Sequence, residues 1–107
     1  MIILSNRMLM VAALLTLAGS SALAADRAAE GKVIAERWCA ACHQISLEQT
    51  TASVDVPSFM TIAKLGTMTD DLAALEGFLS NPHPVMPDLN LTRQEIRDLV
   101  AYISSLK

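Results

Sequence analysis

Residues 26–43 read DRAAEGKVIAERWCAACH and carry the strongest structural signal in the chain. Asp26 can cap the start of a helix, and the residues after it include no proline and many good helix formers. We therefore expect a helix over about residues 27–41. Gly31 lies inside this helix, where it costs roughly 1 kcal/mol relative to alanine unless a neighbour packs closely against it.

The last five residues of this stretch, CAACH, combine two thiols with an imidazole. Cys39 and Cys42 are one helical turn apart, so both sulfurs face a common side, and His43 follows the second directly. Two such thiols can add across the two vinyl groups on one edge of a haem, and the next histidine then lies beneath the iron. The C-x-x-C-H pattern thus predicts one haem c, attached covalently through Cys39 and Cys42, with His43 as an iron ligand.

The same residues have three weaker interpretations. A redox-active dithiol is expected beside a βαβ unit, and the pattern of this chain contains no strand. A zinc site needs a second pair of ligands, for which the sequence offers only His83. A disulfide between Cys39 and Cys42 would close a very small loop and would therefore constrain the unfolded chain little.

The N-terminal quarter of the chain has the composition of an export signal. Arg7 supplies a positive charge, residues 8–19 form an apolar run, and small residues follow up to Ala24. The run of about 12 residues is short of the ~20 that span a bilayer, which favours a cleaved signal over a retained anchor. We expect a secretory signal peptide over residues 1–24, a single domain over residues 25–107, export to the periplasm, and no membrane insertion after cleavage.

The composition of this predicted domain is that of a small and weakly acidic protein. Seven basic and eleven acidic residues leave a formal net charge of −4, which argues against nucleic acids and anionic membranes as partners. A domain of this size buries little apolar surface. Its only aromatic residues are Trp38, Phe59, Phe78 and Tyr102. Because they are so few, we expect a cofactor to fill part of the core.

The middle of the chain predicts a loop and two helices. Residues 44–56 are polar and rich in threonine without helical periodicity, which indicates a loop. A short helix is expected over residues 59–65, opened by Pro57. A further helix is expected over residues 69–80, because Pro82 prevents its continuation.

The last helix has the clearest start signal. Thr92 and Glu95 have the spacing of a capping box, and three prolines stiffen the loop before them. The apolar residues that follow have helical spacing; they are Ile96, Leu99, Val100, Ile103 and Leu106. Since no segment alternates like a strand, we expect an all-α fold of about four helices.

With this motif and this order of elements, the chain resembles the class I c-type cytochromes over nearly the whole of its predicted domain. The resemblance implies a cytochrome c-like fold around one haem, in which the N- and C-terminal helices cross. Gly31 matches the family's small residue at the crossing, and Tyr102 matches its aromatic partner. The family often has an aromatic residue where this chain has Ala35, which implies altered packing at the crossing, with Trp38 compensating.

The resemblance also implies a second iron ligand, Met86. The family carries a methionine followed by proline in the loop before its last helix, and Met86 stands in that place. A methionine with a histidine is a common pair of ligands in cytochromes c. His83 is the competing ligand, and two histidines would lower the reduction potential. Met60 and Met68 are interpreted as core residues, which is the more usual place for methionine.

Pro57 matches a family position whose backbone carbonyl accepts a hydrogen bond from the unligated nitrogen of the haem histidine. The resemblance therefore implies that the Pro57 carbonyl orients His43. Pro57 can also serve as the first residue of the short helix. The family often has a glycine before this proline, where this chain has Val56.

Two protein ligands on the iron leave no open position for a substrate, so we expect an electron-transfer protein and not an enzyme. The expected function is that of a periplasmic single-electron carrier with His43 and Met86 as axial ligands. Two alternatives stay open. The chain can be a permanent haem c subunit of an exported dehydrogenase or oxidase, or a gas-binding cytochrome whose Met86 loop releases the iron.

The expected partners are redox proteins that donate and accept the electron. Some mitochondrial relatives dock through a ring of lysines, whereas here Lys64 is the only lysine between Lys32 and Lys107. Asp88 is close to Met86 in the sequence. We therefore expect a weakly acidic or neutral docking face that meets a neutral or basic partner.

Overall fold

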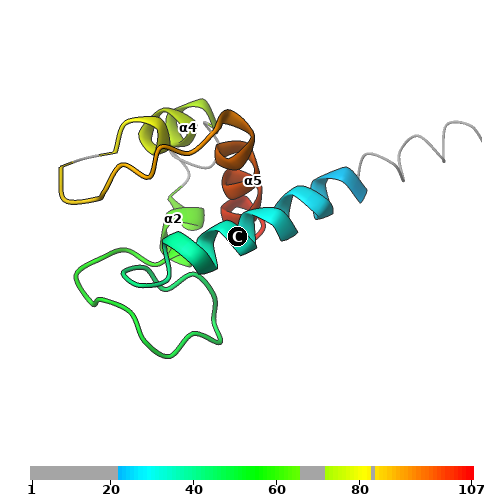
Figure 1. Cartoon of the computed structure of the whole chain (residues 1–107). Helices are drawn as coiled ribbons and strands as arrows, with labels where there is room; N and C mark the ends of the chain where they lie inside the picture. Colours follow the sequence, from blue (N-terminus) through cyan, green and yellow to red (C-terminus); the bar gives the residue numbers. More distant parts are fainter. Residues whose placement is uncertain (1–21, 66–71, 83) are drawn as a thin grey trace, which may run out of the picture.

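The structure is a computed structural model that describes residues 22–65, 72–82 and 84–107. Its helices are residues 22–38, α2 (Phe59–Lys64), α4 (Leu72–Ser80) and α5 (Arg93–Ser104) (Figure 1). These residues contain no strand, and the predicted all-α fold is confirmed. Within the same residues, no helix combines the length and the apolar character required to cross a membrane.

The N-terminal helix differs from its predicted bounds at both ends. It already includes residues 22–25, so Asp26 lies inside the helix and is not its N-cap. Alanine and leucine dominate these residues and continue a helix readily. The helix also ends at Trp38 and not near Ala41, because the residues from Cys39 onward form tight turns.

The bounds of α2 and α4 partly follow the sequence pattern. The N-cap of α2 is Ser58, whose hydroxyl oxygen accepts a hydrogen bond from the Thr61 amide at 3.1 Å. Pro57 therefore precedes the N-cap, and its interpretation as the first helical residue is wrong. The end of α4 at Ser80 agrees with the prediction, since Asn81-Pro82 follows, whereas its predicted start lies outside the described residues.

The predicted capping box at the start of α5 is confirmed. Thr92 Oγ1 accepts a hydrogen bond from the Glu95 amide at 3.1 Å, and Glu95 Oε2 accepts one from the Thr92 amide at 2.7 Å. Just before this cap, Asn90 has a positive φ of 52°, and its amide donates to the Asp88 carboxylate at 2.9 Å. Asparagine tolerates this backbone conformation, which turns the proline-rich loop into α5.

The N-terminal helix and α5 cross at Gly31, as predicted (Figure 1). A methyl group at Gly31 would lie 2.8 Å from Tyr102 Cβ and still closer to the backbone carbonyl of Asp98. The close approach of the two backbones explains why glycine is present inside a helix, since any side chain would separate them.

The core is a single cluster in the described part of the chain. Its buried residues are Ala35, Cys39, Ile45, Phe59, Ala63, Leu75, Ile96, Leu99, Val100, Tyr102 and Ile103. Ala35 is fully buried at the crossing, whereas Trp38 is 53% exposed. The expectation that Trp38 compensates for the small side chain of Ala35 is therefore wrong; α5 packs directly over Ala35's helix at Gly31.

Two long loops leave this core on the side where the N-terminal helix ends. They are residues 44–58, which follow the CAACH segment, and the described residues of 81–92 (81–82 and 84–92), which include Met86. Both project to the left in Figure 1, one above and one below the end of the helix. The fold thus brings the loop that follows His43 and the loop that contains Met86 to one side of the molecule.

Candidate functional site

The CAACH segment forms a compact turn at the end of the N-terminal helix. The Cys39 carbonyl accepts hydrogen bonds from the amides of Cys42, at 3.1 Å, and His43, at 2.8 Å. The Cys39 amide bonds in turn to the Ala35 carbonyl at 2.9 Å. This arrangement preserves the one-turn spacing of the two thiols although the regular helix has ended.

The two cysteines have different environments. Cys39 belongs to the core and is 5% exposed, whereas Cys42 is exposed. Burial raises the pKa of the Cys39 thiol to about 11, because the thiolate would lose its hydration. Both thiols are free, and no disulfide joins them. No group of three or more His, Cys, Asp or Glu side chains among the described residues could hold a metal ion such as zinc; His83 lies outside those residues.

His43 is oriented through its ring. Its Nδ1 lies 2.6 Å from the backbone carbonyl oxygen of Pro57, which can only accept, so Nδ1 is the donor. In the neutral ring, Nε2 then carries the free lone pair, and it has no hydrogen-bond partner among the described residues. The ring also packs against Phe59 with a centroid distance of 5.5 Å. These contacts are those of an imidazole prepared to bind a metal through Nε2.

The hydrogen bond between His43 and Pro57 forms without the glycine that the family often has before the proline. In the part of the chain described, Asn90 is the non-glycine residue with a positive φ, so Val56 has an ordinary backbone conformation. The departure at Val56 therefore does not prevent the Pro57 carbonyl from reaching the ring.

Gln49 is a residue of the site that sequence reasoning missed. Its side-chain amide donates to three backbone carbonyls, those of Ala40 and His43 at 2.9 Å and of Thr51 at 2.6 Å. Its Oε1 accepts a hydrogen bond from the Ile45 amide at 2.9 Å. A polar residue in a threonine-rich loop carries no sequence signal for such a role, because the contacts depend on the loop folding back onto the CAACH segment.

Met86 is half-buried in the loop that precedes α5. No hydrogen bond or ring contact joins it to the CAACH segment in the described part of the molecule. Met60 packs against the core, in agreement with its interpretation as a core residue. Met68 and His83, the other sequence candidates, lie outside the described residues.

The residues of this site fit a covalently attached haem. Cys39 and Cys42 offer two free thiols one turn apart, and His43 offers a nitrogen lone pair next to them. The two loops on the same side expose large apolar side chains, since Val54 is 96% and Val85 90% exposed. The thiols would hold the haem covalently, and His43 would bind its iron.

The chain is similar in sequence to known proteins. Residues 28–107 match the family model whose description is Cytochrome c. The chain is 48% identical over 88 residues to the protein named Cytochrome c-552 of Bradyrhizobium diazoefficiens, and the match covers 82% of each chain. No solved structure matches the chain.

Proposed function

Because this chain belongs to the cytochrome c family, whose members carry electrons on haem c, we propose that it is a periplasmic single-electron carrier with His43 and Met86 as axial ligands. The observation that carries the proposal is the 2.6 Å hydrogen bond from His43 Nδ1 to the Pro57 carbonyl. This bond holds the ring in one tautomer and leaves Nε2 available for iron.

The chain's own residues have separate tasks in this proposal. Cys39 and Cys42 form thioether bonds that keep the cofactor attached, and haem c, when bound, supplies an iron that gains and loses one electron. The Pro57 carbonyl orients His43 and increases its donation to the metal. Met86 supplies a thioether sulfur, which raises the reduction potential relative to a second histidine. With both axial positions filled, the protein is a carrier and not an enzyme.

Covalent attachment is tested on the chain produced in a host that matures c-type cytochromes. We expect a pyridine haemochrome spectrum of the c type, with the haem retained after acid–acetone extraction. Changing both Cys39 and Cys42 to alanine should make the haem extractable or prevent its incorporation. A haem that is extractable from the unmodified chain would contradict the attachment.

The second ligand is tested by the weak absorption band at the red edge of the spectrum that methionine-bound ferric haem shows. We expect the band in the unmodified protein, its loss in Met86→Ala, and its retention in the control Met60→Ala, because Met60 packs in the core. A band that survives in Met86→Ala overturns Met86 as the ligand. A band absent from the unmodified protein points to His83 or to an open position, and rapid CO binding by the ferrous protein identifies the latter.

Export rests on the sequence of residues 1–24, and the mature domain is proposed to be residues 25–107. Residues 22–24 are exposed at the start of the N-terminal helix, so their removal takes nothing from the core. We expect the periplasmic fraction to contain a chain whose mass corresponds to a start at Ala25. A mature chain that keeps residues 1–24 and stays with the membrane would contradict this part of the proposal.

The proposed partners are redox proteins that dock transiently. Lys64 and Asp88 are both exposed, and the net negative charge favours a neutral or basic partner. We expect the rate of electron transfer to a basic redox protein to fall as the salt concentration rises, because salt screens the attraction. Faster transfer at low salt to acidic partners alone would contradict this docking face. A dehydrogenase or oxidase subunit that stays bound throughout purification would indicate the permanent-subunit alternative.

A further inference from the structure

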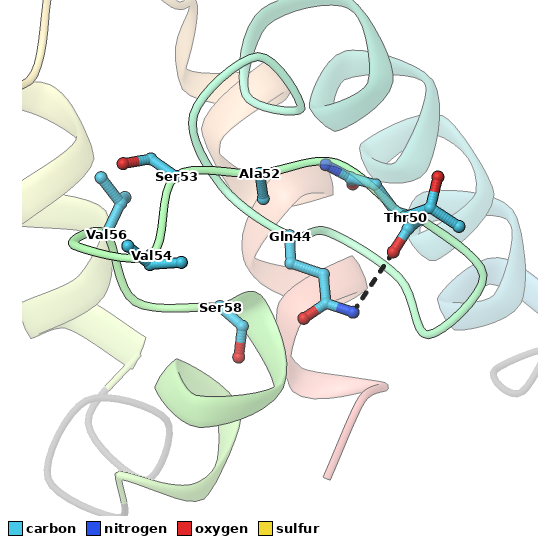
Figure 2. A pocket seen from close by; sticks show the side chains of 8 residues that line it. Gln44, Thr50, Ala52, Ser53, Val54, Val56 and Ser58 are labelled. Carbon is cyan, nitrogen blue, oxygen red and sulfur yellow. Dashed lines mark hydrogen bonds between the residues drawn. The ribbon is translucent and has the colours of Figure 1, made fainter.

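The loop of residues 44–58 is held mainly by hydrogen bonds and not by apolar packing. Ile45 is 3% exposed and belongs to the core, but Leu47 is 80% and Val54 96% exposed. The interior of the loop contains a pocket of about 350 Å³, whose lining includes Gln44, Gln49 and Ser53. Figure 2 shows the Gln44 side chain pointing across this loop, where its amide donates to the backbone carbonyl of Gln49.

The polar contacts that close the loop meet at Gln49. Its four hydrogen bonds reach both sides of the loop and the CAACH turn itself, through the carbonyls of Ala40 and His43. The assignment of its oxygen and nitrogen is fixed by the partners, since a backbone amide can only donate and the three carbonyls can only accept. The Nε2 group has two protons for three carbonyls, so at least one proton is shared.

Gln49 and Pro57 constrain His43 from two directions. The Pro57 carbonyl holds the ring at Nδ1, and the Gln49 amide holds the backbone carbonyl of the same residue. Both supports come from the one loop, whose far part is tied back to the turn by the bond from the Ser53 amide to the Cys42 carbonyl at 3.1 Å. Without Gln49, the ring contact would remain while the backbone that carries the ring could move.

We propose that Gln49 is a positioning residue that fixes the backbone of the haem-attachment turn and so the orientation of His43 toward the iron. This inference rests on the proposed function, because it concerns the residue that binds the iron. This role does not require Gln49 to contact the cofactor. It acts through the carbonyls of Ala40 and His43.

The test uses the haem-loaded protein and the variants Gln49→Ala and Gln49→Glu. Alanine removes all four bonds, whereas glutamate keeps an acceptor for the Ile45 amide and loses the three bonds to carbonyls. We expect the amides of His43 and Ser53 to exchange hydrogen at least about tenfold faster in both variants. The Ile45 amide should exchange faster only in Gln49→Ala. The ferric electron paramagnetic resonance spectrum should shift in both variants, since the backbone that carries the His43 ring is no longer fixed.

The matched control is Gln94→Ala, which removes a glutamine that makes two side-chain hydrogen bonds on α5, to Asp98 and Arg97. It should leave the exchange of His43 and Ser53 and the ferric spectrum unchanged. The inference is overturned if the Gln49 variants keep the unmodified spectrum. It is also overturned if their faster exchange extends equally to Leu99 and Ile103, because the effect would then be a general loss of stability.

A measurement on the unmodified protein covers the case in which neither Gln49 variant matures. The two Nε2 protons of Gln49 should exchange at least about tenfold slower than the side-chain amide protons of the exposed Asn90. Equal rates would overturn the inference. Failure of the proposed function is recognised separately, since the unmodified chain would then lack a c-type haemochrome; an intact haemochrome with unaffected Gln49 variants refutes only the role of Gln49.

Discussion

The hydroxyl of Tyr102 donates a hydrogen bond of 2.6 Å to the backbone carbonyl of Ile45. The two residues are 57 positions apart, and both are buried. The bond joins α5 to the chain just after His43, and the Tyr102 ring also packs against Phe59, with a centroid distance of 6.3 Å. Tyr102 therefore links the helix crossing at Gly31 to the turn that carries the predicted iron ligand.

Tyr102→Phe should lower the free energy of unfolding by about 1–2 kcal/mol, because the Ile45 carbonyl is left buried without its partner while the ring contacts remain. Urea unfolding followed by circular dichroism measures the change. The control is Ser105→Ala, which removes an exposed hydroxyl bonded to the Tyr102 carbonyl and should cost less than about 0.5 kcal/mol. Equal losses in the two variants would show that the buried hydroxyl of Tyr102 contributes no more to stability than the hydroxyl of Ser105.

Tyr102 should also make stability depend on alkaline pH. Burial, and then the negative charges of Glu36 and Glu48, raise the pKa of Tyr102 above its ordinary value of 10.0. The folded state thus binds the phenolic proton more tightly than the unfolded state. The resulting stability is complete below pH 10 and is lost as the pH rises through the folded pKa.

The measurement is urea unfolding of the unmodified chain and of Tyr102→Phe between pH 9 and 12. The difference in their free energies of unfolding should shrink as the pH rises above about 10, since only the unmodified chain loses the contribution of the phenol. Tyr102 is the only tyrosine of the chain, so no other phenol titrates. A difference that stays constant or grows with pH would contradict the raised pKa.

Gly31→Ala should destabilise the protein by about 3 kcal/mol, because the new methyl group meets the backbone of α5, which cannot move away as a side chain could. Gly77→Ala provides the matched comparison. It adds the same methyl group inside α4, where nothing lies within 4 Å of it, and should stabilise the protein by about 0.5–1 kcal/mol. Thermal unfolding of both variants measures whether their changes in stability have opposite signs. Changes of the same sign would refute the close approach of the two helices at Gly31.

Thr92→Ala should cost about 1 kcal/mol, because the Glu95 amide at the start of α5 loses its acceptor. Thr92→Ser keeps the hydroxyl oxygen and should restore most of the stability. Urea unfolding of the two variants measures the contribution of the cap. If serine is as destabilising as alanine, the loss comes from the threonine methyl group and not from the hydrogen bond.

Local patterns predicted the fold class, the start of α5 and the end of α4. The capping box and the Asn81-Pro82 stop act on residues adjacent in sequence, so their effect does not depend on the rest of the molecule. The crossing at Gly31 was predicted from family resemblance, and the structure adds the reason, the approach of the Asp98 backbone. The predicted start and end of the N-terminal helix are wrong, since residues 22–25 extend the helix before Asp26 and tight turns begin at Cys39.

The environments of Trp38 and Gln49 could not be predicted from the sequence. A large aromatic residue next to the CAACH segment suggests a core position, yet Trp38 is 53% exposed. Gln49 stands in a loop without periodicity, and its partners lie in the CAACH turn and at Ile45. Neither outcome follows from residue type, because each depends on the path of the backbone in three dimensions.

The sequence by itself determined which groups can attach and bind a haem, namely the thiols of Cys39 and Cys42 and the imidazole of His43. Their spacing along one turn is a property of the chain and needs no distant partner. Only the tertiary structure decided how His43 is held, through the Pro57 carbonyl at its ring and Gln49 at its backbone. Those contacts join residues that a folded loop brings together, and directional hydrogen bonds form only where the fold aligns donor and acceptor.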